Sequence, residues 1–198
     1  MVKVRPDKPY SANPAGQINV SLARNEYEAA QLVLIPLSDT LRKVTVTAGE
    51  LTGPKRTKLA AENVSVKVVG YVDVKQKSGR APMDPGLIPD PLLPNGPTDV
   101  DRTRVQSWWV TVHAPKDQPA GIYRGTIVVR PQNAPETKIP LQVRVWNFTL
   151  PTTSRLRSSY GINMAMVYNR YDIAPGPGQP TGWNAGAWVG ADSQGRAN

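Results

Sequence analysis

Residues 108–129 read WWVTVHAPKDQPAGIYRGTIVV, and this stretch decides the fold class. Two apolar runs flank a short segment rich in turn-forming residues. Trp108, Val110 and Val112 fall on one face of the first run, which predicts a β-strand with one buried side. Gly121 supplies a turn conformation that other residues adopt only at a cost. The stretch therefore predicts two strands joined by a tight connection.

Two polar side chains of this stretch have predicted structural roles. Tyr123 follows the turn and is placed like a corner tyrosine, whose hydroxyl bonds the backbone. His113, the only histidine of the chain, falls on the face opposite Trp108 and Val110. We therefore expect His113 to be a surface residue and not a metal or catalytic ligand.

The same alternation of apolar and polar residues recurs along the chain. Strands are predicted at residues 18–22, 31–35, 44–48, 64–74, 108–112, 125–130 and 139–145. Residues 24–31 are polar, and we interpret them as the start of a strand and not as a helix. A period of two with one buried face is typical of antiparallel sheets. Seven or more such strands predict an all-β fold, an antiparallel two-sheet β-sandwich that is immunoglobulin-like.

Two regions depart from this pattern. Residues 76–104 hold six prolines and little periodicity, which predicts a long loop. Its apolar stretch at residues 89–94 either contacts another domain or packs over the sandwich. After residue 151 the composition changes: residues 152–154 are typical of a linker, and beyond Asp172 the chain is rich in Gly, Pro and Ala. We therefore divide the chain into a β-sandwich accessory domain (1–151) and a linker with the incomplete start of a second domain (152–198), in which residues 159–167 form one strand.

Composition excludes several classes of function. The chain has 198 residues and a net charge of +9, but its basic residues are spread out, so we expect no nucleic-acid partner. Cysteine is absent and histidine single, so we expect no metal and no cofactor. No apolar run is long enough to span a membrane. The compartment stays open, since a secreted or periplasmic protein without its signal peptide would look the same.

Five segments, in this order and spacing, resemble one family. They are ARNEYEAAQLVLIP (23–36), VVGYVDV (68–74), PDPLLP (89–94), the stretch 108–129, and PLQVRVWNFTLPTTSRLRSSYGIN (140–163). Together they resemble the N-terminal β-sandwich domain of proteins related to glycoside hydrolase family 123, in which the sandwich precedes a (β/α)8 barrel. The resemblance implies a parent enzyme that acts on N-acetylgalactosaminides or related glycans. It places the catalytic Asp-Glu pair on that barrel, which is missing here, so no catalytic residue is carried over.

The carboxylates of the chain itself offer no convincing catalytic pair. Glycoside hydrolysis needs two carboxyl groups roughly 5–9.5 Å apart across a sugar site. The candidates are Glu26 with Glu28, Asp84 with Asp90, and Asp99 with Asp101. The first pair shares one face of a strand, as carboxylates of solvated sheets often do, and nothing near the others predicts a raised pKa. We expect no catalytic residue in this fragment.

Aromatic and apolar residues leave two functions open. The preferred hypothesis is a non-catalytic accessory domain that buttresses the barrel through Pro91, Leu92, Trp146 and Phe148. The alternative is a carbohydrate-binding module in which Trp109, Tyr71 and Asp90 hold a glycan, because exposed aromatic rings stack on sugars. Trp109 and Trp146 each lie opposite a buried neighbour in their strands, so their orientation discriminates between the two hypotheses.

Overall fold

Strands account for almost all regular structure in the first part of the chain. The computed structural model describes residues 3–8, 15–75, 85–153, 159–172 and 186–190. Its contacts divide the chain into two compact units, Met1–Leu150 and Pro151–Asn198. Among the described residues, no helix is long and apolar enough to cross a membrane.

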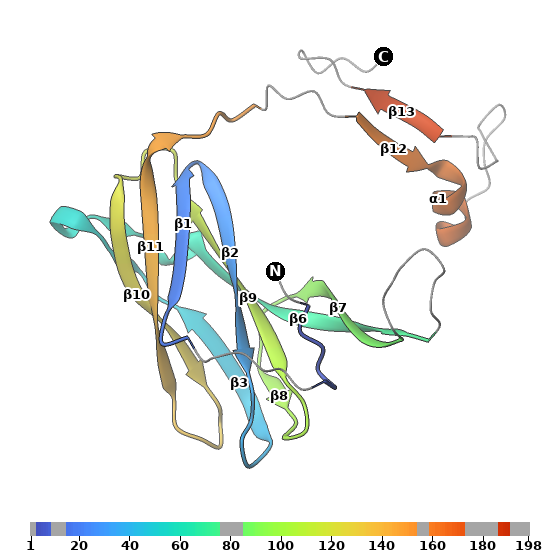
Figure 1. Ribbon diagram of the computed structural model, residues 1–198, viewed down its shortest axis with the longest axis horizontal. Helices are drawn as coiled ribbons and strands as arrows, with labels where there is room; N and C mark the ends of the chain where they lie inside the picture. The colour runs from blue at the N-terminus through green and yellow to red at the C-terminus, as the bar shows by residue number, and fades with distance from the viewer. Residues whose placement is uncertain (1–2, 9–14, 76–84, 154–158, 173–185, 191–198) are drawn as a thin grey trace. The chain divides into compact units, whose positions relative to one another are not determined.

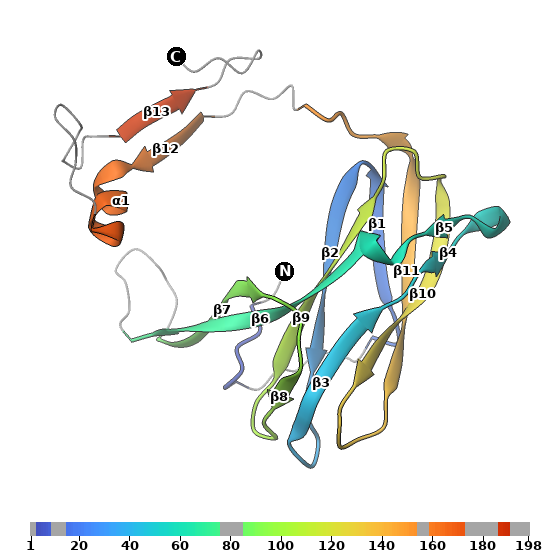
Figure 2. The ribbon, with the colours of Figure 1, turned by 180° about the vertical axis from the view of Figure 1, so that it is seen from behind.

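The first unit is built from two sheets (Figures 1 and 2). The larger sheet runs in the order β1-β11-β10-β3-β8, with β4 paired to β10 and β5 paired to β4. Its strands are β1 (Ile18–Arg24), β3 (Leu41–Ala48), β4 (Leu51–Thr52), β5 (Lys58–Leu59), β8 (Thr98–Val100), β10 (Gly121–Arg130) and β11 (Thr137–Thr149). The smaller sheet runs in the order β2-β9-β6-β7. Its strands are β2 (Glu26–Leu34), β6 (Val64–Val74), β7 (Gly86–Leu93) and β9 (Gln106–Ala114).

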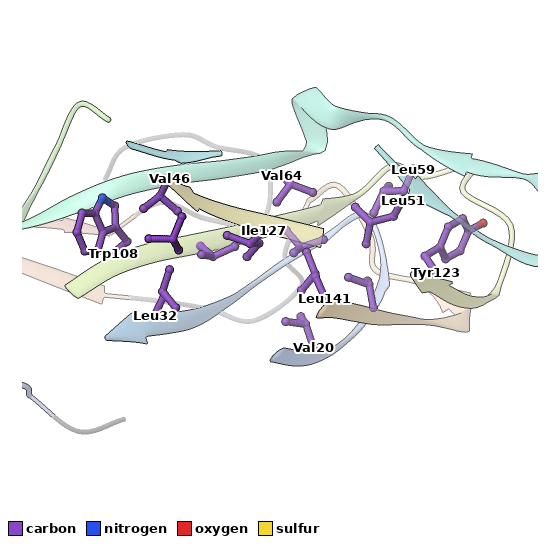
Figure 3. Close-up of a cluster of buried hydrophobic side chains, with 14 of the residues drawn as sticks. Val20, Leu32, Val46, Leu51, Leu59, Val64, Trp108, Tyr123, Ile127 and Leu141 are labelled. Carbon is purple, nitrogen blue, oxygen red and sulfur yellow. The ribbon is translucent and has the colours of Figure 1, made fainter. Parts of the chain in front are cut away.

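One hydrophobic core lies between the two sheets (Figure 3). The larger sheet contributes residues such as Val20, Ile127 and Leu141, and the smaller sheet contributes Leu32 and Trp108. These are the apolar positions of the alternating runs, so the burial follows directly from the period of two. The all-β prediction with two sheets is confirmed.

The direction of one strand differs from the prediction. β1 pairs with β11 in parallel, from Ile18 opposite Leu141 to Leu22 opposite Val145. The expectation of purely antiparallel sheets was therefore wrong for this edge. Alternation fixes which face of a strand is buried but carries no information on the direction of its neighbour. Parallel pairing is available here because a long stretch of chain separates the two strands.

The polar segment that follows β1 is extended, as predicted. Asn25, with a left-handed φ of 61°, separates β1 from β2 and directs the chain from one sheet to the other. Its side chain donates a hydrogen bond of 3.0 Å to the carbonyl oxygen of Leu150. The backbone N–H of Leu150 donates in turn to the carbonyl oxygen of Arg24 at 2.9 Å. This corner therefore holds the end of the first unit in place.

β6 extends beyond its pairing with β9 and there pairs only with β7, which leaves Val72 45% exposed. One prediction fails after β6. The predicted loop at residues 76–104 contains the strands β7 and β8. β7 accommodates Pro89 and Pro91 because it is an edge strand, where a missing N–H breaks no ladder on the outer side.

The corner prediction for Tyr123 is confirmed. Tyr123 is fully buried, and its hydroxyl donates a hydrogen bond of 2.7 Å to the carbonyl oxygen of Pro119. Gly121 has a φ of 150°, and an added Cβ there would lie 2.4 Å from the ring of Pro54. His113 lies half-buried, stacked on Tyr27 at 4.1 Å between ring centroids. Its position is on the outer face, as predicted.

The second unit contains β12 (Ser159–Asn163), α1 (Met164–Tyr171) and β13 (Gly186–Gly190). β13 pairs with β12 in antiparallel register. A single strand over residues 159–167 was predicted. The prediction is wrong for the second half of this segment, because residues from Met164 to Tyr171 form a helix. Residues 162–167 (INMAMV) are mostly apolar, and a short apolar run does not distinguish a strand from a helix.

Candidate functional site

A pocket opens on the outer face of the four-stranded sheet. It has a volume of about 360 Å³ and is lined by Lys3, Gln31, Val69, Pro89, Asp90, Leu92 and Trp109. We call it the Trp109 pocket. Its lining combines an aromatic ring and aliphatic groups with three polar side chains. Pockets of this make-up are typical of small-molecule sites, which measure roughly 300–1,000 Å³.

Strand register explains why these residues meet. Trp109 of β9 is directly opposite Gln31 of β2 on one side and Lys67 of β6 on the other. Val69 of β6 is opposite Leu92 of β7. Directly opposed residues project to the same face of a sheet. Because Trp108 points into the core, its neighbour Trp109 must point outward, where it is half-buried.

Asp90 reaches this pocket because β7 contains an irregularity. Val69 pairs with Leu92 but Tyr71 pairs with Pro89, so β7 has one residue more than β6 in this stretch. The bulge lies opposite Gly70, where a Cβ would sit 2.9 Å from the ring of Pro91. Bulges redirect side chains next to functional sites. Here the bulge brings the exposed Asp90 to the rim of the pocket.

Tyr71 does not join Trp109 and Asp90. It lines two neighbouring hollows of about 420 Å³ each, which it shares with Arg104 and Gln106. Its buried hydroxyl lies close to that of Ser107, but the geometry does not make a hydrogen bond, and neither hydroxyl has another partner among the described residues. Burial raises the pKa of Tyr71, and the nearby Ser107 opposes this only in part. The structure thus brings two of the three predicted glycan-binding residues together and leaves the third outside.

The residues predicted to contact another domain divide between the two sheets. Pro91 and Leu92 belong to β7 of the four-stranded sheet, and Leu92 is 42% exposed. Trp146 and Phe148 belong to β11 of the larger sheet, where they are 44% and 56% exposed. The predicted set therefore does not form one continuous surface.

Trp146 and Phe148 form an aromatic surface just before the end of the first unit. They alternate with Val143 and Val145, which are buried, so they project from the outer face of the larger sheet. The Arg144 guanidinium lies over the Trp146 ring at 5.1 Å from its centroid, a cation–π contact. We call Arg144, Trp146 and Phe148 the β11 aromatic surface.

Four of the six carboxylates in the candidate catalytic pairs accept hydrogen bonds from the chain itself. Glu26 accepts the backbone N–H of Ala23 at 2.5 Å, and Glu28 accepts that of Ala29 at 3.1 Å. Asp99 accepts the backbone N–H of Lys43 at 2.7 Å. These are local structural roles. Asp84, proposed as a partner of Asp90, lies outside the described residues.

Asp101 also has a local role. Its carboxylate accepts hydrogen bonds from the hydroxyl and the backbone N–H of Thr103, at 2.5 and 2.8 Å. These bonds, the hydroxyl's above all, lower the pKa of Asp101, so it does not suit a general acid. Within the part of the chain that the structure describes, no group of three or more His, Asp or Glu side chains is placed to hold a metal ion.

Comparison with known families identifies the chain. The sequence profile of the glycoside hydrolase 123 N-terminal domain matches residues 8–131. The chain belongs to the glycoside hydrolase 123 N-terminal domain family. A search among curated protein sequences gives no match.

One solved structure shares the fold of this glycoside hydrolase 123 N-terminal domain. A family 123 glycoside hydrolase from Clostridium perfringens, studied for glycolipid glycan hydrolysis, superposes with a TM-score of 0.61 at 17% identity. The similarity covers 68% of this chain and 24% of that enzyme, so the chain spans about a quarter of its length. The periplasmic chaperone SfaE aligns over 69% of this chain and 58% of its own, with a TM-score of 0.30 and 10% identity.

Sequence reasoning missed four lining residues of the Trp109 pocket in this glycoside hydrolase 123 N-terminal domain: Lys3, Gln31, Val69 and Pro89. Alternation in residues 31–35 places Gln31 opposite Leu32, which was a signal that it faces outward. No sequence pattern predicts that Gln31 pairs with Trp109, because the register of two strands far apart in sequence is set by the assembled sheet.

Proposed function

We propose that this domain is a non-catalytic accessory domain that supports the catalytic barrel of a glycosidase acting on N-acetylgalactosaminides or related glycans. One observation carries the proposal: Trp146 and Phe148 are exposed at the end of β11, within a few residues of the boundary at Leu150. Exposed aromatic side chains that cluster at a domain end mark a surface for contact with another domain.

The fold of the domain supports this role. We infer that its two sheets form an immunoglobulin-like sandwich, and the Tyr123–Pro119 hydrogen bond supports this because such a corner recurs in these sandwiches. The parallel β1–β11 pair and the bonds of Asn25 and Leu150 fix the position of β11. The β11 aromatic surface is therefore presented on a rigid element.

For the second unit we propose the truncated start of a (β/α) barrel domain, with residues 152–198 as linker and first elements. β12 is followed directly by α1, which is the strand–helix order of a barrel unit. The antiparallel β13 departs from that plan, since barrel strands run parallel.

The non-catalytic role is tested by hydrolysis. The 198-residue chain and the parent protein that carries the barrel are assayed on an aryl N-acetylgalactosaminide. We expect release of the aryl group by the parent protein alone. Hydrolysis by the 198-residue chain would contradict the proposal.

The buttressing role is tested on the β11 aromatic surface. The double variant Trp146→Ser/Phe148→Ser should leave the stability of the 198-residue chain nearly unchanged, because both rings are exposed in it. In the parent protein the same variant should lower the melting temperature and separate the unfolding of the two domains. The variant Leu37→Ser is the matched control, since Leu37 is 98% exposed and belongs to the connection between β2 and β3. If the parent protein has the same melting temperature with and without the double substitution, buttressing through these residues is contradicted.

A further inference from the structure

Two polar side chains of the Trp109 pocket, Gln31 and Asp90, take no part in the hydrogen bonds and ion pairs of the described fold. Neither the Gln31 carboxamide nor the Asp90 carboxylate has a hydrogen-bond or ion-pair partner among the described residues. By contrast, Glu26, Asp99 and Asp101 all accept hydrogen bonds from the backbone. Gln31 is half-buried, and a half-buried amide that faces a pocket without a partner is available for a ligand.

The floor of the pocket is apolar and includes one large ring. Trp109, Val69, Leu92 and Pro89 supply it. An indole ring that is half-buried within a sheet is held by its neighbours and loses little freedom when a ligand stacks on it. The site is therefore suited to a flat ligand with one apolar face and a polar edge.

A pyranose ring has this chemistry. Its C–H groups form an apolar face that packs on an aromatic ring, while its hydroxyl groups lie around the edge. Those hydroxyls donate to a carboxylate such as Asp90, and both donate to and accept from an amide such as Gln31. A volume of about 360 Å³ is at the small end of ligand sites, which suits one or two sugar units.

The charges of the lining favour a neutral ligand. The pocket has one carboxylate, Asp90, and one ammonium group, Lys3. Asp90 opposes a phosphate or sulfate group, and Lys3 opposes an ammonium group that would otherwise suit the face of Trp109. We propose that the Trp109 pocket binds a neutral glycan, with Trp109 as the stacking platform and Asp90 and Gln31 as hydroxyl-binding groups. The proposal does not depend on the accessory role, because the pocket lies on the sheet opposite to the β11 aromatic surface.

Calorimetric titration of the 198-residue chain tests the proposal. The probes are N-acetylgalactosamine, galactose and chitotriose as neutral saccharides, with choline as a cationic probe and glucose 6-phosphate as an anionic one. We expect at least one neutral saccharide to bind. Trp109→Ala should weaken this binding by about tenfold or more, because it removes the stacking face. Asp90→Asn removes the charge that strengthens the hydrogen bond to a sugar hydroxyl, and Gln31→Ala removes a hydrogen bond. Each should weaken the binding by about threefold to tenfold.

The matched control is Trp146→Ala, which removes an exposed tryptophan from the other sheet. It should bind like the unchanged chain. Asp90→Asn keeps the test valid if Trp109→Ala fails to fold, because Asp90 is exposed and has no hydrogen-bond or ion-pair partner among the residues that the structure describes. Absence of saccharide binding by the folded chain would overturn the proposal, as would binding of choline or the phosphate alone. Full affinity in Asp90→Asn and Gln31→Ala, or loss in Trp146→Ala, would also overturn it.

Discussion

The hydroxyl of Tyr123 lies 2.7 Å from the carbonyl oxygen of Pro119 and donates a hydrogen bond to it. The Thr57 hydroxyl, which donates to the Pro54 carbonyl at 2.7 Å, lies 3.3 Å from the Tyr123 hydroxyl, so the tyrosine contacts three segments of the chain. Gly53 packs against its ring so closely that an added Cβ would lie 2.4 Å from Tyr123 Cε1. The fully buried ring thus fixes the corner through which the chain enters β10.

Tyr123→Phe is expected to lower the free energy of unfolding by about 1–2 kcal/mol. The ring and its packing remain, but the Pro119 carbonyl loses its hydrogen-bond donor. Urea denaturation followed by circular dichroism measures the change, with an unchanged m-value as the sign that the native state is intact. A variant as stable as the unchanged chain would show that the corner bond contributes nothing.

Tyr71→Phe is the matched comparison, because the buried Tyr71 hydroxyl has no hydrogen-bond partner. Removing an unsatisfied polar group relieves a desolvation cost, so we expect stability to stay equal or to rise by up to about 1 kcal/mol. The same substitution should therefore destabilise the domain at Tyr123 but not at Tyr71. A loss similar to that of Tyr123→Phe would contradict the unpartnered state of Tyr71.

The raised pKa of Tyr71 also predicts a dependence on alkaline pH. Desolvation disfavours the phenolate in the folded state, so the folded pKa lies above the ordinary value of 10.0. The unfolded chain then loses its proton first. The contribution to stability is fully present below about pH 10 and is lost as pH rises through the folded pKa. The free energy of unfolding should fall more steeply with rising pH for the unchanged chain than for Tyr71→Phe. Parallel dependence on pH in the two proteins would contradict a raised pKa of Tyr71.

Backbone conformation makes Gly121 difficult to replace. Its φ of 150° is unfavourable for residues with a Cβ, and that Cβ would also meet Pro54 at 2.4 Å. We expect Gly121→Ala to destabilise the domain by about 2 kcal/mol or more. Gly49→Ala is the control, since nothing lies within 4 Å of its Cβ position. It should be neutral or stabilising by up to about 1 kcal/mol, through the unfolded chain. Equal changes in melting temperature for Gly121→Ala and Gly49→Ala would contradict a special conformational requirement at Gly121.

The alternation of apolar and polar residues determines which face of a strand is buried, but it does not determine the direction of the neighbouring strand. The faces of Trp108 and Trp109, the buried Tyr123 and the left-handed Gly121 follow from local pattern and turn chemistry, and all were predicted. The parallel pairing of β1 with β11 did not follow, because the period of two is the same for either direction.

The candidate site was predictable in part for the same reason. Trp109 and Asp90 were selected for their chemistry, and the pocket contains both. Gln31 was missed because it joins the pocket only through its register with Trp109. Asp90 reaches the rim through a bulge in a proline-containing edge strand, and such a strand has no periodic signal. Residues brought together by register or by irregularity are the ones that a single sequence leaves undetermined.

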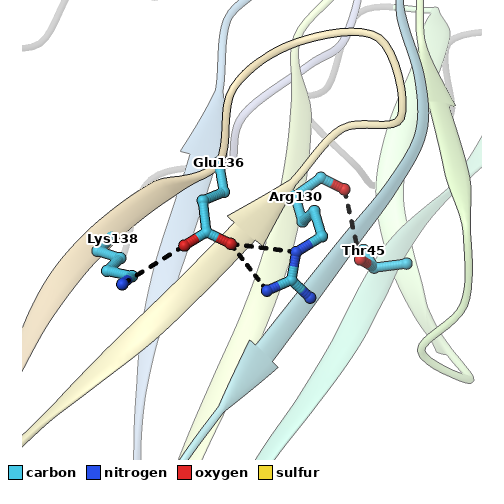
Figure 4. Close-up of polar contacts among 4 residues, drawn as sticks. All are labelled: Thr45, Arg130, Glu136 and Lys138. Carbon is cyan, nitrogen blue, oxygen red and sulfur yellow. Dashed lines mark hydrogen bonds and ion pairs between the residues drawn. The ribbon is translucent and has the colours of Figure 1, made fainter.

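Acid pH should weaken the connection between β10 and β11, where Glu136 lies between two cations (Figure 4). The Arg130 guanidinium donates to one Glu136 oxygen at 3.2 and 2.8 Å, and the Lys138 ammonium lies 3.4 Å from the other. These contacts, Arg130 foremost, hold the pKa of Glu136 below its ordinary value of 4.5.

Because the folded pKa is lowered, the contribution of Glu136 to stability is present above the unfolded pKa and is lost as pH falls through the folded one. Glu136→Gln should therefore be less stable than the unchanged chain near neutral pH and equal to it at about pH 3. The difference should be small and should shrink in high salt, because the carboxylate is exposed. Arg130→Gln should remove the same pH-dependent difference, and combining it with Glu136→Gln should add little, since the two residues act as one pair. Urea unfolding of the four proteins at both pH values measures this, and a Glu136→Gln difference that persists unchanged at low pH would contradict the ionic origin of the contact.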